Sequence, residues 1–259
     1  MPKIELRKVG LSYFSRQGEA EALNDISLSI NSGEFVAIVG PSGCGKSTLL
    51  SLISGILTPT TGSIWLDSER VEAPSRKIGY MLQQDYLFEW RTILDNVLLG
   101  AEIQGRDLAV CRERATALLN RYGLGEFANA LPRELSGGMR QRAALARTLV
   151  TEPDVVLLDE PFAALDSQTR IALADEVTEA LRRERKTVVL ITHDIGEAIT
   201  MAERVVVLSR RPGRIKSEHS MRYAGTANAP MSPFAKRAAP EFSSYFQTVW
   251  AELDVHVAG

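Results

Sequence analysis

The residues best suited to do chemistry form one glycine-rich stretch, Gly40-Pro-Ser-Gly-Cys-Gly-Lys-Ser-Thr48, which follows an apolar run at residues 35–39. This stretch fits the pattern G-x-x-x-x-G-K-[ST], which places a loop between a buried strand and a helix. Glycines let such a loop curl tightly and turn successive backbone N–H groups toward one point. We therefore predict that the loop binds the phosphates of a nucleoside triphosphate. Its residues are Gly40, Pro41, Ser42, Gly43, Cys44, Gly45, Lys46, Ser47 and Thr48.

Two side chains of this loop have predicted roles of their own. Lys46 can reach the outer phosphates, and the Ser47 hydroxyl can ligate Mg²⁺. The helix that begins near Lys46 adds the positive end of its dipole at the same point. The alternative is a glycine-rich turn with an incidental lysine, but the order of strand, loop and helix favours phosphate binding.

Two carboxylates follow the apolar run Val155-Val-Leu-Leu158. A buried strand would deliver Asp159 at its carboxyl end, the edge where open α/β sheets place their ligands. Asp159 would then hold Mg²⁺ through water, because Mg²⁺ keeps several of its waters. Glu160 would polarise an attacking water as general base. A strand that merely ends in acidic residues is the alternative, and the phosphate loop earlier in the chain favours the functional interpretation.

A histidine follows the next apolar run, at residues 187–191. His193 should reach the same sheet edge, where it could bond the terminal phosphate and help to orient water. A lone histidine is more often structural, but its place after a buried parallel strand favours function.

The stretch Leu135-Ser-Gly-Gly-Met-Arg-Gln-Arg142 places a second anion-binding helix start in the chain. Ser136, Gly137 and Gly138 lie at that start. One triphosphate does not need two such cradles from one subunit. A two-fold dimer would give each one a use, with the nucleotide lying between the phosphate loop of one chain and Ser136–Gly138 of the other. A plain N-cap followed by a flexible glycine pair remains the alternative.

Composition matches an ordinary globular protein, with 45% hydrophobic and 24% charged residues among 259. The formal net charge of −2 gives no reason to expect a nucleic-acid partner. No apolar run approaches the ~20 residues that span a bilayer, and the first residues lack an apolar signal core. We therefore expect a chain that is not exported, with Cys44 and Cys111 as reduced thiols in the cytosol.

Hydrophobic periodicity predicts an α/β fold in which helices cover a parallel sheet. Half-buried, antiparallel strands are expected at 3–13 and 22–30, and Tyr13 could stack on a base or be an ordinary strand aromatic. Helices at 92–103 and 107–122 would form a helical insertion at about 85–150, the second of them with a stripe of Leu108, Cys111, Ala115, Leu118, Leu119 and Tyr122. Further strands are expected at 34–39, 61–67, 77–82, 155–158, 187–191 and 205–208, and further helices at 46–56, 135–150, 167–184 and 194–202. Residues 222–239 resemble a linker, and a helix from Pro240 would carry Phe242, Phe246, Val249 and Leu253 on one side.

Taken together, these motifs resemble the nucleotide-binding subunit of an ATP-binding-cassette (ABC) transporter over about residues 3–218. The resemblance rests on GPSGCGKST, LSGGMRQR, VVLLDEP and Ala164-Leu-Asp166, completed in the right order by Gln83 and His193. It implies a RecA-like parallel-sheet ATPase core with an N-terminal antiparallel β subdomain and an inserted α-helical subdomain. It also implies domain limits at 1–220 for the cassette and 221–259 for the linker and terminal helix.

The resemblance carries roles onto individual residues. Tyr13 matches the aromatic that stacks on adenine, and Gln83 the glutamine that touches Mg²⁺ and links the nucleotide to the membrane partner. Asp166 matches the aspartate that communicates across the dimer, Glu160 the catalytic base, and His193 the switch histidine. Met139 departs from the glutamine of many members but leaves the serine and glycines before it intact.

The function that the resemblance implies is ATP hydrolysis, with ATP and Mg²⁺, by a homodimer or heterodimer at the cytoplasmic face of the plasma membrane. A separate permease would be its partner, with a periplasmic or lipid-anchored solute-binding protein acting indirectly. The lever is expected at residues 83–100, where Leu87, Phe88 and Trp90 could contact the permease or belong to the core.

Stretches such as Gln84-Asp-Tyr-Leu-Phe-Glu-Trp90 and Arg211-Pro-Gly-Arg-Ile215 resemble importers of the nitrate/sulfonate/taurine group. Some relatives with the Leu-Phe-Glu-Trp variant look like importers of thiamine-precursor pyrimidines. A soluble ABC ATPase of DNA repair or translation and a small-molecule kinase are the rival functions. The first usually has two cassettes or long coiled coils, and the second needs no LSGG stretch.

Overall fold

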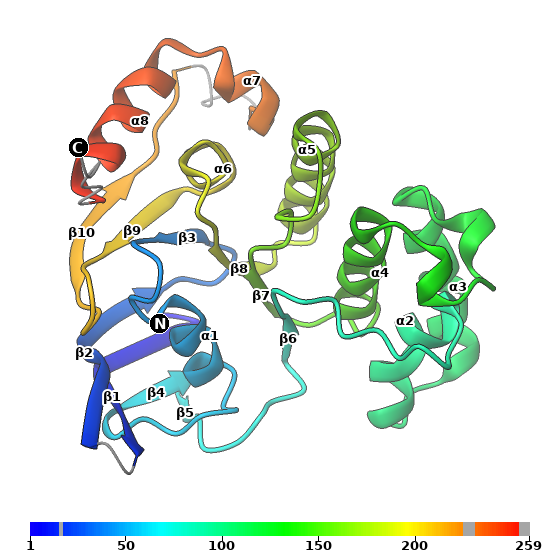
Figure 1. Cartoon of the computed structure of the whole chain (residues 1–259), viewed down its shortest axis with the longest axis horizontal. Helices are drawn as coiled ribbons and strands as arrows, with labels where there is room; N and C mark the ends of the chain where they lie inside the picture. The colour runs from blue at the N-terminus through cyan, green and yellow to red at the C-terminus, as the bar shows by residue number, and fades with distance from the viewer. Residues whose placement is uncertain (16–17, 225–230, 254–259) are drawn as a thin grey trace. The chain divides into compact units, whose positions relative to one another are not determined.

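The computed structural model describes residues 1–15, 18–224 and 231–253 (Figure 1). The chain divides into two compact units, one made of Met1–Ser75 with Ala174–Gly259 and the other of Arg76–Leu173. Among the described residues, no helix has both the length and the apolar character needed to cross a bilayer.

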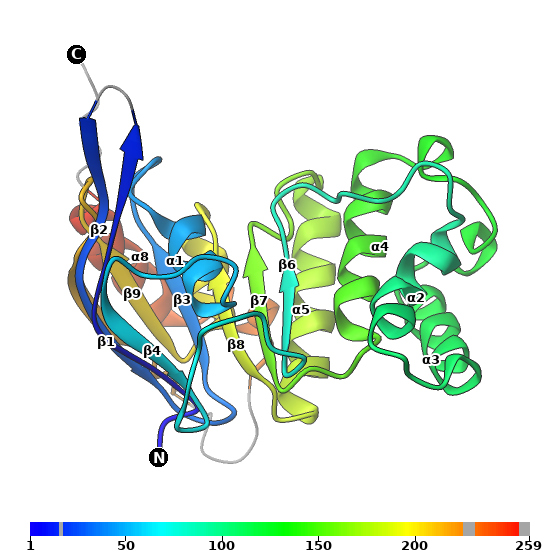
Figure 2. The same cartoon turned by 90° about the horizontal axis from the view of Figure 1, so that it is seen from below.

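The first unit contains an antiparallel sheet with the strand order β2-β1-β4-β5. Its strands are β1 (Ile4–Ser15), β2 (Gly18–Ile30), β4 (Thr61–Leu66) and β5 (Glu69–Arg70). β1 pairs with β2 from Ile4 opposite Ile30 to Ser15 opposite Gly18, so the predicted antiparallel pair is present and longer than expected. Figure 2 shows β1, β2 and β4 running side by side. Alternating apolar residues such as Ile4, Leu6 and Leu28 are buried, as the period-two pattern predicts.

A second set of strands in this unit runs in the order β10-β9-β3-β8. The strands β3 (Phe35–Val39), β8 (Thr187–Ile191) and β9 (Arg204–Leu208) are parallel, and β10 (Ile215–Ser220) is antiparallel to β9. Every residue of β3 and β8 is buried, which explains their continuous apolar sequences. Because β3 and β8 are parallel neighbours, the segments that follow them leave the same edge of the sheet.

Helices α1 (Lys46–Ile53), α6 (Ile195–Met201), α7 (Pro233–Arg237) and α8 (Pro240–Glu252) complete the first unit. α6 packs against β3 on one side and against α7 and α8 on another. The expected linker at 222–239 is partly wrong, because α7 lies inside it, begun by Ser232 as N-cap and Pro233. Residues 225–230 of that expected linker lie outside the described residues.

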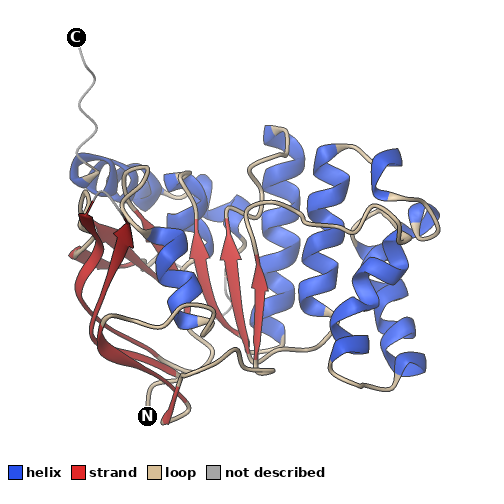
Figure 3. Cartoon of the chain, turned by 60° about the horizontal axis from the view of Figure 1, so that its bottom comes forward, coloured by secondary structure: helices blue, strands red, loops and turns tan. Residues whose placement is uncertain are grey.

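The second unit contains the parallel pair β6 (Ile78–Met81) and β7 (Val155–Asp159) with three helices, seen as blue ribbons in Figure 3. The helices are α2 (Ile93–Ile103), α3 (Leu108–Arg121) and α4 (Gly137–Leu149), with short 3-10 turns at Gly125–Phe127 and Pro132–Glu134. α2 packs against both α3 and α4. α5 (Ser167–Arg183) begins in this unit and ends in the first.

The predicted apolar stripe of α3 is present in part. Cys111, Ala115, Leu119 and Tyr122 are buried and Leu118 is half-buried, whereas Leu108, the first residue of the helix, is exposed. Cys44 and Cys111 are both buried free thiols. Burial raises the pKa of Cys44, with an opposing effect from the Lys46 charge, which keeps this thiol protonated at neutral pH.

Candidate nucleotide site

The glycine-rich loop follows β3 and leads into α1, in the order that the sequence predicts. Gly43 and Gly45 have φ values of 74° and 104°, in the left-handed region where other residues are strained. A Cβ at Gly40 would lie 2.9 Å from Cys44 Sγ and 3.1 Å from the Leu208 carbonyl oxygen. The glycines therefore permit a tight loop that ends at the N-terminus of α1, where unpaired N–H groups favour an anion.

The polar side chains of this loop are positioned at the start of α1. Lys46 Nζ donates to the carbonyl oxygens of Gly40 and Pro41, at 2.9 and 3.0 Å. Ser47 is exposed, and the Tyr13 hydroxyl lies 3.3 Å from Thr48 Oγ1. Tyr13, which was predicted to stack on a base, is thus exposed next to the phosphate loop.

A cavity of about 340 Å³ opens beside the loop within the first unit. Gly40 and Ser42 line it together with His193, so the structure brings the predicted histidine and the phosphate loop to one cavity. Trp250 and Leu253, at the end of α8, line it as well. The sequence predicts this helix but not its place beside the phosphate loop. No local pattern encodes a contact between residues so far apart in the chain.

A buried carboxylate holds the segment that carries His193. Glu197 is 4% exposed and accepts a hydrogen bond of 2.6 Å from the Thr192 hydroxyl. Asp194 caps α6 by accepting from the Glu197 backbone N–H at 3.0 Å. Sequence reasoning missed Glu197, although an acid three residues after an aspartate N-cap is the spacing of a capping box.

In the second unit, two of the predicted site residues are in contact. Gln83 Nε2 donates to Glu160 Oε2 at 3.1 Å. Glu160 itself has a φ of 48°, which is uncommon for a residue with a side chain. Asp159, the residue before Glu160, is the last residue of β7 and is buried.

Gln141 was missed by sequence reasoning although it lies in the LSGG-containing stretch. This residue of α4 is buried, donates to the Glu160 carbonyl oxygen at 3.3 Å and accepts from the Ala164 N–H at 3.0 Å. It therefore holds both ends of the loop at 160–164. The available signal was a polar residue among the buried alanines and leucines of a helix, which requires partners.

The LSGG stretch caps α4 as predicted. Ser136 is exposed and accepts from the Met139 N–H at 3.3 Å, and Gly137 and Gly138 form the first turn. A Cβ at Gly138 would lie 2.7 Å from Leu165 Cδ2, so a larger residue would force this leucine to move.

Asp166 lies at the start of α5, where it accepts from the backbone N–H groups of Gln168 and Thr169 at 3.1 and 3.0 Å. A hydrogen bond from the Thr169 side chain, with these backbone bonds, lowers the pKa of Asp166 and keeps it anionic.

The segment after Gln83 carries exposed aromatics on a firmly held backbone. Trp90 is 76% exposed and lies 4.8 Å from Phe88, measured between ring centroids. Leu87 is buried, so its expected contact with a partner is wrong and the core alternative holds for it.

Helices α2 and α4 supply the anchors of this segment. Arg147 donates to the carbonyl oxygens of Asp85 and Tyr86, and Arg140 pairs with the Asp85 carboxylate at 3.0 Å. Asn96 is fully buried and bonds the Phe88 N–H and carbonyl.

A family model described as ABC transporter matches residues 23–163. The chain belongs to the ABC transporter family. The ATP-binding protein YtlC of Bacillus subtilis, described as an uncharacterized ABC transporter protein, is 45% identical over 98% of this chain and 96% of its own length. The nitrate import ATP-binding protein NrtD of Synechocystis sp. is 41% identical over 93% and 91% of the two chains. The taurine import ATP-binding protein TauB of Ruegeria pomeroyi is 40% identical over 86% and 84%.

Solved structures of ABC cassettes have the same fold. One is a dimeric ATP-binding cassette in a post-hydrolysis state bound to ADP and Pi, with a TM-score of 0.78 and 35% identity over 85% of this chain and 99% of that one. The predicted RecA-like α/β fold and the predicted resemblance to the nitrate and taurine importer group are therefore confirmed. This cassette is an ABC ATPase subunit that binds ATP.

Proposed function

We propose that this cassette dimerises around two ATP molecules and hydrolyses them to power solute import through a separate membrane permease. The observation that carries the proposal is the phosphate loop, with Gly43 and Gly45 in left-handed conformations ahead of α1 and His193 lining the same cavity. The import ATP-binding relatives for nitrate and taurine support a nitrate/sulfonate/taurine-type solute. A thiamine-precursor pyrimidine is the alternative solute, favoured by the Leu-Phe-Glu-Trp stretch alone.

In the proposed ATP complex, the loop N–H groups and Lys46 hold the phosphates. Lys46 now donates to two loop carbonyls, and it would exchange them for phosphate oxygens, which make stronger, charge-assisted hydrogen bonds. The Tyr13 ring, exposed beside Thr48, would stack on adenine.

The donor set fits Mg²⁺. Ser47 offers an exposed hydroxyl, Asp159 a carboxylate at a strand end, and Gln83 an amide whose nitrogen bonds Glu160 and whose oxygen can serve as a ligand. All three are oxygen ligands, which Mg²⁺ prefers over nitrogen and sulfur. When bound, the ion would supply positive charge to the phosphates.

In the proposed hydrolysis, the water oxygen bonds to the terminal phosphorus of ATP as Glu160 accepts a proton from that water. The bond between this phosphorus and the ADP oxygen breaks, which releases ADP and phosphate. The Gln83 amide holds one Glu160 carboxylate oxygen in place. His193 would bond the terminal phosphate. Ser136, Gly137 and Gly138 would meet the nucleotide of the second chain, and Asp166 would communicate across the dimer.

The proposed partner surface is the segment that joins Gln83 to α2. Exposed Phe88 and Trp90 would contact the permease, and Arg147 and Asn96 would transmit movement because they fix the backbone of this segment. We place the cassette at the cytoplasmic face of the membrane as a peripheral subunit, with a solute-binding protein acting on the permease from the other side.

The test measures ATP hydrolysis by the purified chain alone and with membranes that contain the permease. We expect stimulation by the permease and loss of ATP binding in Lys46→Gln, since a principal phosphate contact disappears. Lys8→Gln, which removes an exposed lysine charge elsewhere in the first unit, is the matched control. Normal ATP affinity in Lys46→Gln, or phosphate transfer to an acceptor other than water, would contradict the proposal.

A further inference from the structure

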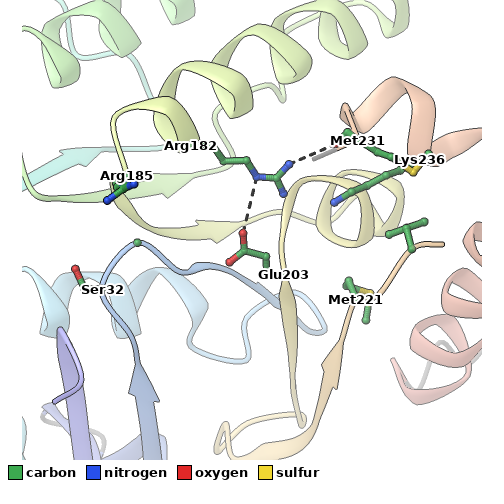
Figure 4. A pocket seen from close by; sticks show the side chains of 9 residues that line it. Ser32, Arg182, Arg185, Glu203, Met221, Met231 and Lys236 are labelled. Atoms are coloured by element: carbon green, nitrogen blue, oxygen red, sulfur yellow. Dashed lines mark hydrogen bonds and ion pairs between the residues drawn. The ribbon is translucent and has the colours of Figure 1, made fainter. Parts of the chain in front are cut away.

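A second cavity, of about 670 Å³, lies in the first unit between the core and the C-terminal segment (Figure 4). Three cationic side chains line it, Arg182 from the end of α5, Arg185 just after that helix and Lys236 from α7, and Glu203 is the one acid in its lining. Figure 4 shows Arg182 between Glu203 and Lys236, with the Lys236 side chain extending toward it. Positive charge therefore exceeds negative charge around this space.

Lys236 is buried in an unusual way for a lysine, being only 4% exposed. Its Nζ donates to the Thr200 carbonyl oxygen at 2.8 Å and lies 5.0 Å above the centroid of the Tyr223 ring. Neither contact neutralises the charge. An ammonium has three N–H donors, so this group retains capacity to bond an anion.

The two arginines are also incompletely matched. Arg182 donates to the carbonyl oxygens of Met201 and Met231 at 2.9 and 3.5 Å and forms an ion pair with Glu203, but at 3.9 Å from Glu203 Oε1 its buried Nε makes no hydrogen bond. Arg185 has an exposed side chain that makes no ion pair with any residue in the described part of the chain. A cation that is buried without an acid to pair with, as Lys236 is among the described residues, is costly, and an anion placed beside it would offset that cost.

The remaining walls are apolar. Met221, Tyr223 and Met231 line the cavity, and methionines adapt their shape to different apolar groups. We propose that this cavity binds a small organic anion, with its carboxylate, sulfonate or phosphate head held by the Arg182, Arg185 and Lys236 cations and its apolar body against Met221, Tyr223 and Met231. The phosphate loop, Glu160 and His193 take no part in this site, so the inference goes beyond the proposed function and does not depend on it.

The experiment is calorimetric titration of the full chain with its phosphate loop saturated by ADP, since that loop also binds anions. Butanesulfonate is the probe, sulfate represents the head alone and butanol the apolar body alone. We expect butanesulfonate to bind with saturation and more tightly than either fragment. Arg185→Gln and Lys236→Met should each weaken it about tenfold or more, the effect of losing one charge-assisted hydrogen bond.

Arg183→Gln is the matched control, since it removes an exposed charge of α5 that does not line the cavity. Its affinity for butanesulfonate should equal that of the parent chain. Absence of saturable binding up to about 10 mM, a concentration that would detect even weak sites, overturns the proposal. Equal affinity in the parent chain and both cavity variants overturns it too. Sulfate binding as tightly as butanesulfonate would overturn the apolar half of it.

Discussion

The backbone of Glu160 is held in a conformation that residues with side chains seldom adopt. Its φ of 48° is maintained by bonds on both sides, from Gln83 to the carboxylate and from Gln141 to the carbonyl oxygen. Uncommon backbone conformations persist only where their surroundings enforce them, and they cluster at functional sites. This observation supports the proposed role of Glu160 independently of the motif in which it lies.

Glu160→Gln should bind ATP normally and lose turnover by roughly 10²–10⁴-fold, the usual contribution of a positioned general base. The amide keeps the shape of the side chain but cannot accept a proton from water. Steady-state ATPase assays and nucleotide titration measure the two effects separately. Glu126→Gln, at an exposed glutamate of the same unit, is the control, and near-normal hydrolysis by Glu160→Gln would remove this residue from its role.

Gln141→Leu should destabilise the chain by about 1–3 kcal/mol, since it leaves two backbone groups without their partner. Those groups are the Glu160 carbonyl oxygen and the Ala164 N–H. Because Gln141 is buried and bonds the backbone of the loop that carries Glu160, kcat should fall while the affinity for ATP stays unchanged. Urea unfolding and ATPase kinetics together test this, and a stability and kcat equal to those of the parent chain would refute it.

At the scale of elements, most helices and strands could be predicted because their patterns are local. The apolar runs of β3 and β8 and the caps of α2 and α4 are encoded in adjacent residues. β10 was not predicted because its sequence lacks an apolar pattern. Its residues are alternately half-buried and exposed, and they include charged residues such as Lys216 and Glu218. Only its pairing with β9 makes it a strand.

The candidate site divides in the same way. The phosphate loop, the LSGG stretch and the acids at the end of β7 carry their chemistry in consecutive residues, so sequence alone predicts them. Glu197 and Gln141 act through hydrogen bonds that form only in the folded chain. The sequence shows that each is a polar residue in a helix, but it does not show which groups they bond. For Leu87 the neighbouring residues in the sequence were misleading. Phe88 and Trp90 are exposed, whereas Leu87 between Tyr86 and Phe88 is buried.

The end of α8 offers an optical test of the cavity beside the phosphate loop. Trp250 lines this cavity with Gly40, Ser42 and His193, and half of its surface is exposed. Binding of Mg-ATP should therefore change its fluorescence, because the charge and solvent around the indole change. Trp250→Phe should abolish the change and Trp65→Phe, in β4, should preserve it. A change that survives in Trp250→Phe would show that the signal comes from another tryptophan.

At the scale of the whole molecule, the C-terminal segment adds two features to the cassette core. The end of α8 lines the cavity beside the phosphate loop. Lys236 of α7 lines the second cavity, together with Arg182 and Arg185. Both contacts involve α6, which packs against α7, α8 and β3. Residues 221–224 and 231–253 are therefore an integral part of the first unit and supply walls to two of its cavities.

Lys236 should make the free energy of unfolding of the chain increase with pH, whereas a lysine paired with an acid makes it decrease. Burial, assisted by the Arg182 charge and opposed by Glu203, lowers the pKa of Lys236 from 10.5 to about 8. Between these two values the unfolded chain binds more protons than the folded chain, so the free energy of unfolding rises with pH through this window. The other groups around it are Arg185, Tyr223 and the neighbouring Arg237, and burial raises the pKa of Tyr223, so this phenol stays uncharged between pH 7.5 and 9.5.

We therefore expect the free energy of unfolding of the parent chain, relative to that of Lys236→Met, to increase by about 1–2 kcal/mol from pH 7.5 to pH 9.5. Urea unfolding of both proteins at the two pH values measures this, and the comparison cancels groups that titrate in both. Saturating butanesulfonate should reduce the increase, because an anion beside Lys236 stabilises its charged form and raises its pKa. A difference between the two proteins that is constant or decreases with pH would show that the pKa of Lys236 is not lowered in the folded chain.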